Sequence, residues 1–479
     1  MMLRVSEKIK VPLFSIAASL LLAGACGKTD EPVSPYVDKD IPVITGYLNE
    51  ITDSVHFSSS DGLFEYAARA IENMDVFFPK EIMDLMYLQN KTELGLRNYI
   101  DVGVNPDGTS KLHFELCNFT YRTVDVHGNP IMLSGSVAFP NNSDEERSYE
   151  LNDITLYSSH YLLPHTLSPT ENGSPAMLRV MFNNMVVMPE LQGNGGSYGQ
   201  VETADIVADV AARQSIDCEL AALELVGKLG LKMGRDYGTY NMGASKGAFT
   251  AMAVQRALET TEVPDIRKAV NLKSSYCGCG PYDLSGALEY YCRMGGEMNF
   301  PWFVPVAVKN VFDSYRELFV GYGLPDFFTD RFNDAYTLLE AAVSQEFSWE
   351  ELNSLFFEYG FTNIKSILNG RMFDASGMPD RKDSLYSLFD KCLQANNPAC
   401  GWKPGVPVLI AASPGDDFVP YGTTRKTYEQ LAVGDMGIPN ENVIWKEMAD
   451  NVGHIAAAEL CLIDMLMYRN PALQLEPFQ

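Results

Sequence analysis

The chain has 479 residues, of which 46% are hydrophobic and 11% aromatic, and 36 lysines and arginines stand against 62 aspartates and glutamates for a formal net charge of −26. A chain this acidic lacks the basic surface that phosphate backbones require, which excludes nucleic-acid binding as its main role. Nearly half of the residues can be buried, which excludes a largely disordered protein. The length suits about three small domains or one large domain with an insertion.

The N-terminus has the pattern of a secretory signal over residues 1–25, because basic residues precede an apolar stretch at 11–22. Small residues then lead to Cys26, an order that resembles the lipobox of bacterial lipoproteins. That resemblance implies a lipid anchor on Cys26; the alternative is an ordinary signal peptide with Cys26 incidental. Residues 26–40 are polar and contain proline, as a tether should. We therefore expect a cell-envelope protein, an outer-membrane lipoprotein that is periplasmic or surface-exposed and attached to the membrane through Cys26.

The nine cysteines of the chain permit disulfides in such an oxidising compartment. Local pairs are conceivable, namely Cys392 with Cys400, and Cys292 with Cys277 or Cys279. The sequence contains no C-x-x-C and no H-E-x-x-H, so we expect no metal site.

The first part of the mature chain, residues 41–111, has apolar residues at helical spacing over 63–71 and 80–88. We predict an N-terminal helical segment there and assign it no function. From residue 112 the pattern changes to the alternation of strands, and a turn at 127–130 indicates an antiparallel hairpin.

Strand and helix patterns then alternate along the chain, which indicates an α/β protein with a mainly parallel sheet flanked by helices on both faces. The expected strands are 153–157, 185–188, 237–242, 268–272, 406–412 and 442–447, and the expected helices are 203–229, 246–258, 423–431 and 455–468.

The alternation stops between residues 282 and 400, which are helix-like and rich in aromatic residues. We predict a helical cap inserted into an α/β domain made of residues 112–281 and 401–479. The aromatic residues of this cap either line a binding pocket or form an ordinary apolar core.

Two stretches fit the pattern G-x-S-x-G, in which a serine sits on a tight turn between a strand and a helix. The first is GASKG at 243–247, which has a predicted strand directly before it and a predicted helix with small residues directly after it. The second, around Ser197, lies in a glycine-rich loop that no strand adjoins. The context therefore favours Ser245 as the nucleophile and keeps Ser197 as the alternative.

A serine nucleophile needs a general base and an orienting acid, which follow it in the chain order serine, acid, histidine when it occupies such an elbow. His454 is the one histidine after residue 245, and it lies in the loop before the last helix. The acid should lie at the carboxyl end of the strand at 406–412, where Asp416 and Asp417 compete.

From about Tyr121 to its end, the chain resembles α/β-hydrolase-fold esterases and lipases of the bacterial secreted type. The residues that carry this resemblance are the hairpin at 125–137, the strand and loop at 187–197, and the segment GPYDL at 280–284. In the family pattern Asp-x-x-Val-Pro the acid stands four residues before the proline, which selects Asp416.

The resemblance implies a serine hydrolase that cleaves carboxylic esters, with Ser245, Asp416 and His454 as its catalytic triad. It also implies an oxyanion hole formed by backbone N–H groups of Lys246 and of the loop at His160 and Tyr161, and no metal or organic cofactor. Lys246 departs from the family, in which glutamine commonly follows the serine.

The expected partner is a small-molecule or glycan-linked ester. Acetylated or feruloylated glycans, acylglycerols and small xenobiotic esters all remain open as substrates. A peptidase on the same triad, or a catalytically inactive glycan-binding lipoprotein, are the alternative functions.

Overall fold

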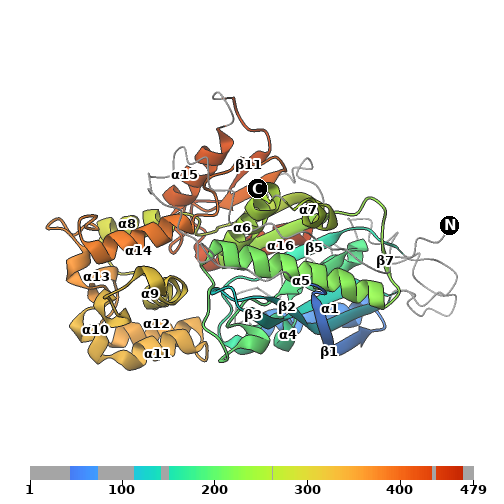
Figure 1. The fold of residues 1–479 in the computed structure, drawn as a ribbon, viewed down its shortest axis with the longest axis horizontal. Helices are drawn as coiled ribbons and strands as arrows, with labels where there is room; N and C mark the ends of the chain where they lie inside the picture. Colours follow the sequence, from blue (N-terminus) through green and yellow to red (C-terminus); the bar gives the residue numbers. More distant parts are fainter. Residues whose placement is uncertain (1–43, 74–112, 142–149, 262, 434–437, 468–479) are drawn as a thin grey trace.

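A computed structural model describes residues 44–73, 113–141, 150–261, 263–433 and 438–467. The main feature is a nine-stranded sheet with the strand order β1-β2-β3-β6-β5-β8-β9-β10-β11 (Figure 1). The predicted signal peptide, Cys26, the tether and the predicted helix at 80–88 all lie outside the described residues.

The first three strands of this sheet are antiparallel: β1 (Leu48–Phe57), β2 (Phe114–Val124) and β3 (Pro130–Pro140). The hairpin of β2 and β3 confirms the alternation read from the sequence. Its turn is held by Asp125, whose side chain accepts hydrogen bonds from the backbone N–H groups of His127 and Asn129, each at 2.8 Å.

The prediction of a helical segment over 41–111 is wrong for residues 48–57, which form strand β1. This stretch contains the β-branched residues Ile51, Thr52 and Val55, and it pairs with β2 at the edge of the sheet. Helix α1 (Ser60–Asn73) follows it directly and covers the predicted helical spacing at 63–71.

The remaining strands of the large sheet are parallel to one another. They are β5 (Ile154–Ser158), β6 (Met185–Pro189), β8 (Thr239–Ala244), β9 (Leu272–Gly278), β10 (Val408–Ala412) and β11 (Val443–Glu447). A small separate sheet pairs β4 (Glu150–Leu151) with β7 (Lys232–Met233).

The strand predicted over 268–272 is misplaced. Pro264 starts a helix, α7 (Pro264–Val270), and Asn271 ends it in the left-handed conformation with φ 48°. Strand β9 therefore begins at Leu272, the last of the residues that the sequence pattern assigns to it.

Helices cover both faces of the sheet. On one face lie α5 (Ala208–Lys228) and α6 (Lys246–Thr260), which share an apolar core with the cap (Figure 1). A second core, on the other face, joins α1 to the last helix, α16 (His454–Met467). Helix α15 (Tyr421–Ala432) packs beside β10 and β11.

The insertion between β9 and β10 forms the yellow and orange lobe of Figure 1. Within residues 282–400, all of which are described, no segment joins the large sheet. The helices of this cap are α8 (Leu284–Met294), α9 (Phe303–Ser314), α10 (Asp330–Asp334), α11 (Tyr336–Ser344), α12 (Trp349–Glu358), α13 (Ile364–Ile367) and α14 (Ser384–Ala395).

The local disulfide pairs considered from the sequence are not formed, because Cys277, Cys279, Cys292 and Cys392 are free and buried. Each thiol instead packs as a small apolar side chain in one of the cores. None of the helices over the described ranges is long and apolar enough to cross a membrane.

Candidate active site

The turn after β8 places Ser245 in a strained conformation, with φ 54° and ψ −124°. A non-glycine residue rarely adopts a positive φ, so the surrounding structure must impose it. The Ser245 N–H is fixed to the carbonyl of Gly278 at 2.8 Å. The two flanking glycines are required, because a Cβ on Gly243 would lie 2.1 Å from the Gly247 oxygen and one on Gly247 would lie 2.0 Å from the Ser158 oxygen.

His454 reaches the serine from the far end of the chain. Its Nε2 lies 2.8 Å from the Ser245 Oγ, and both side chains are buried. His454 is the first residue of α16, and its backbone N–H donates to the Asp417 carboxylate at 2.8 Å. The predicted nucleophile and base are therefore in direct hydrogen-bond contact.

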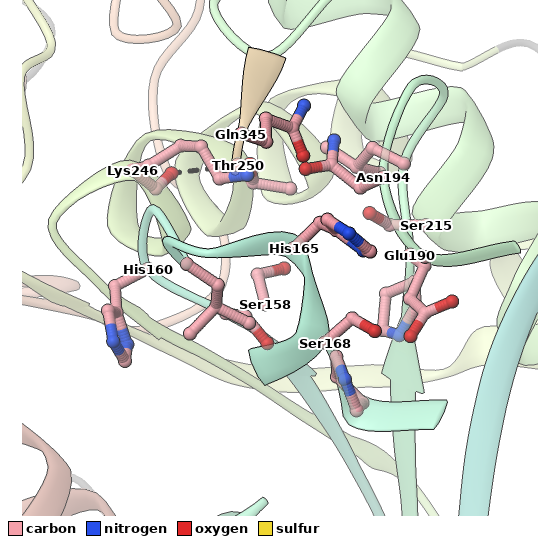
Figure 2. Close-up of a pocket in the computed structure, with 16 residues that line it drawn as sticks. Ser158, His160, His165, Ser168, Glu190, Asn194, Ser215, Lys246, Thr250 and Gln345 are labelled. Atoms are coloured by element: carbon pink, nitrogen blue, oxygen red, sulfur yellow. Dashed lines mark hydrogen bonds between the residues drawn. The ribbon is translucent and has the colours of Figure 1, made fainter. Parts of the chain in front are cut away.

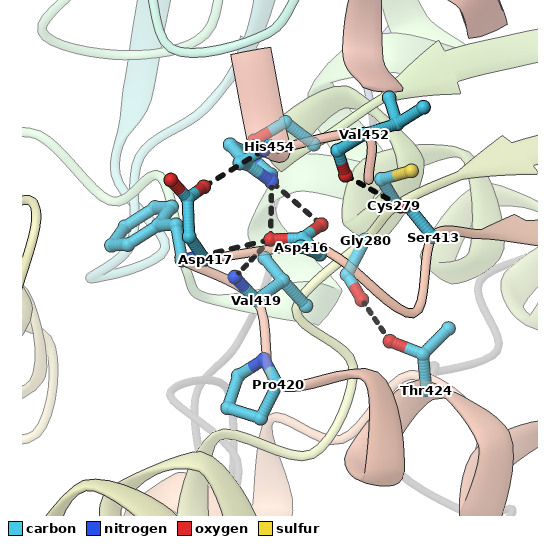
Figure 3. Close-up of polar contacts among 12 residues, drawn as sticks. Cys279, Gly280, Ser413, Asp416, Asp417, Val419, Pro420, Thr424, Val452 and His454 are labelled. Atoms are coloured by element: carbon cyan, nitrogen blue, oxygen red, sulfur yellow. Dashed lines mark hydrogen bonds and ion pairs between the residues drawn. The ribbon is translucent and has the colours of Figure 1, made fainter. Parts of the chain in front are cut away.

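Asp416, and not Asp417, faces the other nitrogen of the imidazole (Figure 3). The His454 Nδ1 lies 2.9 Å from one Asp416 oxygen, and the two side chains are only 2% and 3% exposed. The other oxygen of Asp416 accepts backbone hydrogen bonds from Phe418 at 3.0 Å and Val419 at 2.7 Å. These contacts hold the carboxylate so that it can orient the imidazole and stabilise its charged form.

Asp417 has a separate role in the same loop. Besides capping the first N–H of α16, it accepts a hydrogen bond from Asn299 of the cap at 2.6 Å. The loop that carries Asp416 is also joined to the loop before His454, since the Ser413 hydroxyl donates to the Val452 carbonyl at 2.5 Å (Figure 3). The predicted acid and base are thus positioned by one network rather than by two independent loops.

The alternative nucleophile, Ser197, lies in a short 3₁₀ turn and makes only local hydrogen bonds. Its hydroxyl donates to the Asn194 carbonyl and accepts from the Gly193 N–H, each at 2.9 Å. Among the described residues no imidazole is hydrogen-bonded to it, so the geometry favours Ser245.

The backbone N–H groups of the two predicted oxyanion donors have no hydrogen-bond acceptor among the described residues, so they are available to bind an oxyanion. No described group accepts a hydrogen bond from the backbone N–H of Lys246 or of Tyr161, and the His160 N–H is equally free. Lys246 begins α6 immediately after the serine, where helix N–H groups have no intrahelical partner. The loop with His160 and Tyr161 follows β5, the strand next to β8 in the sheet.

The side chain of Lys246 is largely buried and contacts two residues near the turn at Ser245, namely Asp205 and Tyr161. Its Nζ donates to Asp205 at 2.9 Å, with side-chain exposures of 13% and 1%, and lies 5.3 Å from the centroid of the Tyr161 ring. The same Asp205 oxygen also accepts a hydrogen bond from Asn194 at 3.0 Å. This lysine therefore links the elbow to the loop that carries the second predicted donor.

A cavity of about 230 Å³ opens at the serine and histidine. Its wall is mainly apolar and combines the loop after β5, one face of α16 and the start of α12. The apolar residues from these elements include Leu162, Leu163, Leu167, Ile455, Ala458, Leu462 and Trp349, and the acidic ones are Glu350 and Glu459. A cleft of this kind, with a few polar groups in an apolar wall, is typical of small-molecule sites.

A second, smaller cavity of about 30 Å³ lies behind the loop after β5 and is mostly lined by polar residues (Figure 2). The hydroxyls of Ser158, Ser168 and Ser215 line it and have no hydrogen-bond partner among the described residues. Ser245 and His454 do not line it, and it is too small for an ester substrate. We therefore place substrate in the larger cavity.

The electrostatics of the site depend mainly on burial. Desolvation lowers the pKa of His160 to about 4, helped by the nearby charges of Lys246 and His454, so His160 is neutral at pH 7. Desolvation raises the pKa of Glu459 to about 7. Next to the base, the Phe418 ring packs edge-on against the imidazole of His454 at a centroid distance of 5.1 Å.

Sequence reasoning missed Trp349 and Glu459, two residues of the cavity wall that belong to no motif. Trp349 begins α12 directly after Ser348, which forms a capping box with Glu351. That signal can be read in the sequence S-W-E-E, but it predicts only a helix start. Nothing in the sequence indicates that this helix start meets α16 at the serine.

No family model and no curated protein matches the sequence. Among solved structures, the chain is similar to a provisionally assigned hydrolase from Legionella pneumophila, with a TM-score of 0.63, 20% identity, and coverage of 90% of this chain and 100% of that one. It is similar to the rice cell wall degrading esterase LipA from Xanthomonas oryzae in a ligand-bound form, with a TM-score of 0.59, 19% identity, and coverage of 78% and 92%. It is also similar to Candida antarctica lipase A in its closed state, with a TM-score of 0.51, 14% identity, and coverage of 78% of each chain. The sheet, its flanking helices and these neighbours identify an α/β-hydrolase fold.

Proposed function

We propose that the protein is a serine hydrolase that cleaves carboxylic esters through an acyl-enzyme on Ser245. The observation that carries this proposal is the continuous hydrogen-bond chain from Ser245 to His454 to Asp416, with steps of 2.8 and 2.9 Å, at the opening of an apolar cavity. Nucleophile and base within hydrogen-bond reach, with a third group orienting the base, are the geometric signature of covalent hydrolysis.

In the first half of the reaction, His454 takes the proton of the Ser245 hydroxyl as the serine oxygen attacks the ester carbonyl. Asp416 keeps the proton of His454 on Nδ1 and stabilises the imidazolium that forms. The same proton then passes from Nε2 to the leaving alcohol, and the acyl group stays on Ser245. Water attacks this acyl-enzyme in the second half, with His454 again as the base.

The oxyanion of each tetrahedral intermediate would be held by the backbone N–H of Lys246 and by that of Tyr161. A donor of this kind lowers the barrier by about 3 kcal/mol in comparable sites. No step in this scheme requires a metal or an organic cofactor. The apolar wall supports an ester with an apolar acyl or alcohol group, which gains stability when it leaves water.

We also propose that the protein acts in the cell envelope, anchored through lipid on Cys26. The support for this is the sequence pattern of residues 1–40. A Cys26→Ser variant expressed with its leader is then expected to leave the membrane fraction, measured by immunoblot after fractionation. A variant that remains with the membranes would contradict the anchor.

Hydrolysis of p-nitrophenyl butyrate by the purified protein tests the enzymatic proposal. The Ser245→Ala variant should lose turnover by about 10⁴-fold or more, because the nucleophile of a triad carries most of its rate. The matched control is Ser197→Ala, whose serine belongs to the other glycine-rich pattern and should keep its activity. Circular dichroism shows whether each variant is folded.

Two results would contradict the proposal. Full turnover by folded Ser245→Ala would show that Ser245 is not the nucleophile. A wild-type protein that does not hydrolyse the ester would favour the glycan-binding alternative. A peptide p-nitroanilide in the same assay tests the peptidase alternative. Faster hydrolysis of the anilide than of the ester would show that peptides, and not esters, are the substrate class.

A further inference from the structure

The acidic residue Glu459 lies on α16, the helix that begins at His454, and lines the same cavity as that histidine. Ile455, Ala458, Glu459 and Leu462 all line the larger cavity, and their spacing along α16 places them on one side of the helix. Three of these four residues are apolar. The fourth position therefore introduces a carboxyl group into the part of the wall that substrate would touch.

The carboxyl of Glu459 has no partner among the described residues. Its Oε1 is fully enclosed and makes no hydrogen bond, and no ion pair within the described ranges involves this residue. The described residues that line the cavity include no lysine and no arginine. An enclosed, unsatisfied carboxyl oxygen is destabilising, so a residue that served only packing would be apolar here.

The other acidic residue of the cavity offers a direct contrast. Glu350 lies at the start of α12 and is exposed to solvent, where water satisfies its carboxylate. Glu459 is partly buried, and this burial raises its pKa to about 7. Near neutral pH its carboxyl is therefore partly protonated, so it can accept or donate a hydrogen bond without holding a full charge.

Glu459 lies farther along α16 than His454, the residue that contacts the serine. It lies five residues beyond His454 on α16, which corresponds to a rise of about 7.5 Å along the helix. The rings of Tyr157, Tyr161 and Trp349 line the same cavity. Such a wall suits a flat aromatic group that extends from the ester carbonyl and ends in a polar atom, as in a hydroxycinnamoyl ester.

We propose that Glu459 is a specificity-determining residue that hydrogen-bonds a hydroxyl group on the aromatic part of an ester substrate bound between Ser245 and α16. This inference rests on the proposed esterase function and narrows it to esters of hydroxylated aromatic acids. A hydroxyl fits better than an ammonium group, because burying a charged pair in an apolar wall carries a large desolvation penalty. A site built to hydrogen-bond a substrate hydroxyl discriminates strongly against the analogue that lacks it.

The test compares kcat/KM for methyl 4-hydroxycinnamate and methyl cinnamate, two esters that differ only in the hydroxyl group. The wild-type protein should prefer the hydroxylated ester by about tenfold or more. In Glu459→Leu this ratio should fall to about one, and in Glu459→Gln, which keeps the shape and hydrogen-bonding capacity, it should fall only in part. Glu350→Leu is the matched control, because it removes an acidic residue of the same cavity and should retain the wild-type ratio.

Stability gives a second readout. Glu459→Leu removes an unsatisfied carboxyl and should raise the thermal unfolding midpoint, a behaviour expected of a residue kept for function. If Glu459→Leu does not fold, the ratio of the two kcat/KM values in Glu459→Gln decides: a partial fall supports the inference, and an unchanged wild-type ratio overturns it.

Several outcomes would overturn the inference. An equal preference for the hydroxylated ester in wild type and Glu459→Leu would show that another group reads the hydroxyl. Faster wild-type cleavage of methyl 4-(aminomethyl)cinnamate than of the hydroxylated ester would show that Glu459 favours a cationic group on the substrate over a hydroxyl group. Failure of this inference is distinguishable from failure of the esterase proposal, since the latter would abolish cleavage of methyl cinnamate and p-nitrophenyl butyrate as well.

Discussion

The candidate triad and the wall of the cavity lie in contact, yet they are constructed in different ways. Ser245, Asp416 and His454 each follow a parallel strand, namely β8, β10 and β11. Ser245 is fixed by a hydrogen bond to the end of β9, and Asp416 and His454 are fixed by hydrogen bonds within the loop after β10 or to it. The cavity wall instead combines a loop after β5, the start of a cap helix and one side of α16. The comparison teaches that the candidate triad is positioned by strand ends and the loops after them, each with its own sequence signal, whereas the cavity wall depends on which helix faces pack together.

The largest expected difference in kcat between variants of two adjacent residues is the one between Asp416 and Asp417. Asp416→Asn should reduce kcat by about 10³-fold to 10⁴-fold, because an amide no longer holds the imidazole in its working tautomer. Asp417→Asn keeps an oxygen that can accept the His454 N–H and should lose about tenfold at most. Steady-state kinetics with one p-nitrophenyl ester compares the two variants. A larger loss of kcat in Asp417→Asn than in Asp416→Asn would make Asp417 the acid and would contradict the assignment of Asp416.

A smaller effect is expected at the boundary between the two regions, where Lys246 pairs with Asp205 and lies against Tyr161. Lys246→Met leaves a buried carboxylate without its cation, so the free energy of unfolding should fall by about 3 kcal/mol. Movement of the loop that carries the predicted oxyanion donor Tyr161 should also lower kcat by about tenfold while KM changes little. Urea denaturation and steady-state kinetics measure both quantities.

The double variant Lys246→Met with Asp205→Asn is the control for this prediction. It removes the unpaired charge and should recover a large part of the lost stability, while kcat stays low if the lysine positions the loop. A Lys246→Met variant with wild-type kcat and stability would show that the pair does not position the site.

The sequence was sufficient for most of the α/β core because strand and helix alternate there with clear periodicity. The hairpin at β2 and β3, the strand before Ser245 and the last helix are all where the pattern placed them. Strand β1 escaped prediction because its β-branched residues are a weak local signal and its partner, β2, is separated from it in sequence. The strand predicted at 268–272 is misplaced because Pro264 starts a short helix and Asn271 ends it. These two helix-boundary signals matter more here than the apolar residues between them, which the pattern assigned to a strand.

The triad could be proposed from the sequence because each residue carries a mark: the glycines around Ser245, the proline after Asp416 and the isolated His454. The choice between Asp416 and Asp417 rested on a family pattern, and the structure gives its physical basis in the backbone N–H groups of Phe418 and Val419. Glu459 and Trp349 carry no such mark. Their role depends on which helix faces meet at the serine, and periodicity does not contain that information.

The most direct test of the central claim is mass spectrometry of the wild-type protein after reaction with a fluorophosphonate. Fluorophosphonates react with a serine whose hydroxyl is activated by a base, so labelling reports the Ser245–His454 pair itself. We predict one adduct, located on the peptide that contains Ser245, and its loss in His454→Ala. An adduct on Ser197, or ester turnover by a protein that stays unlabelled, would contradict the account.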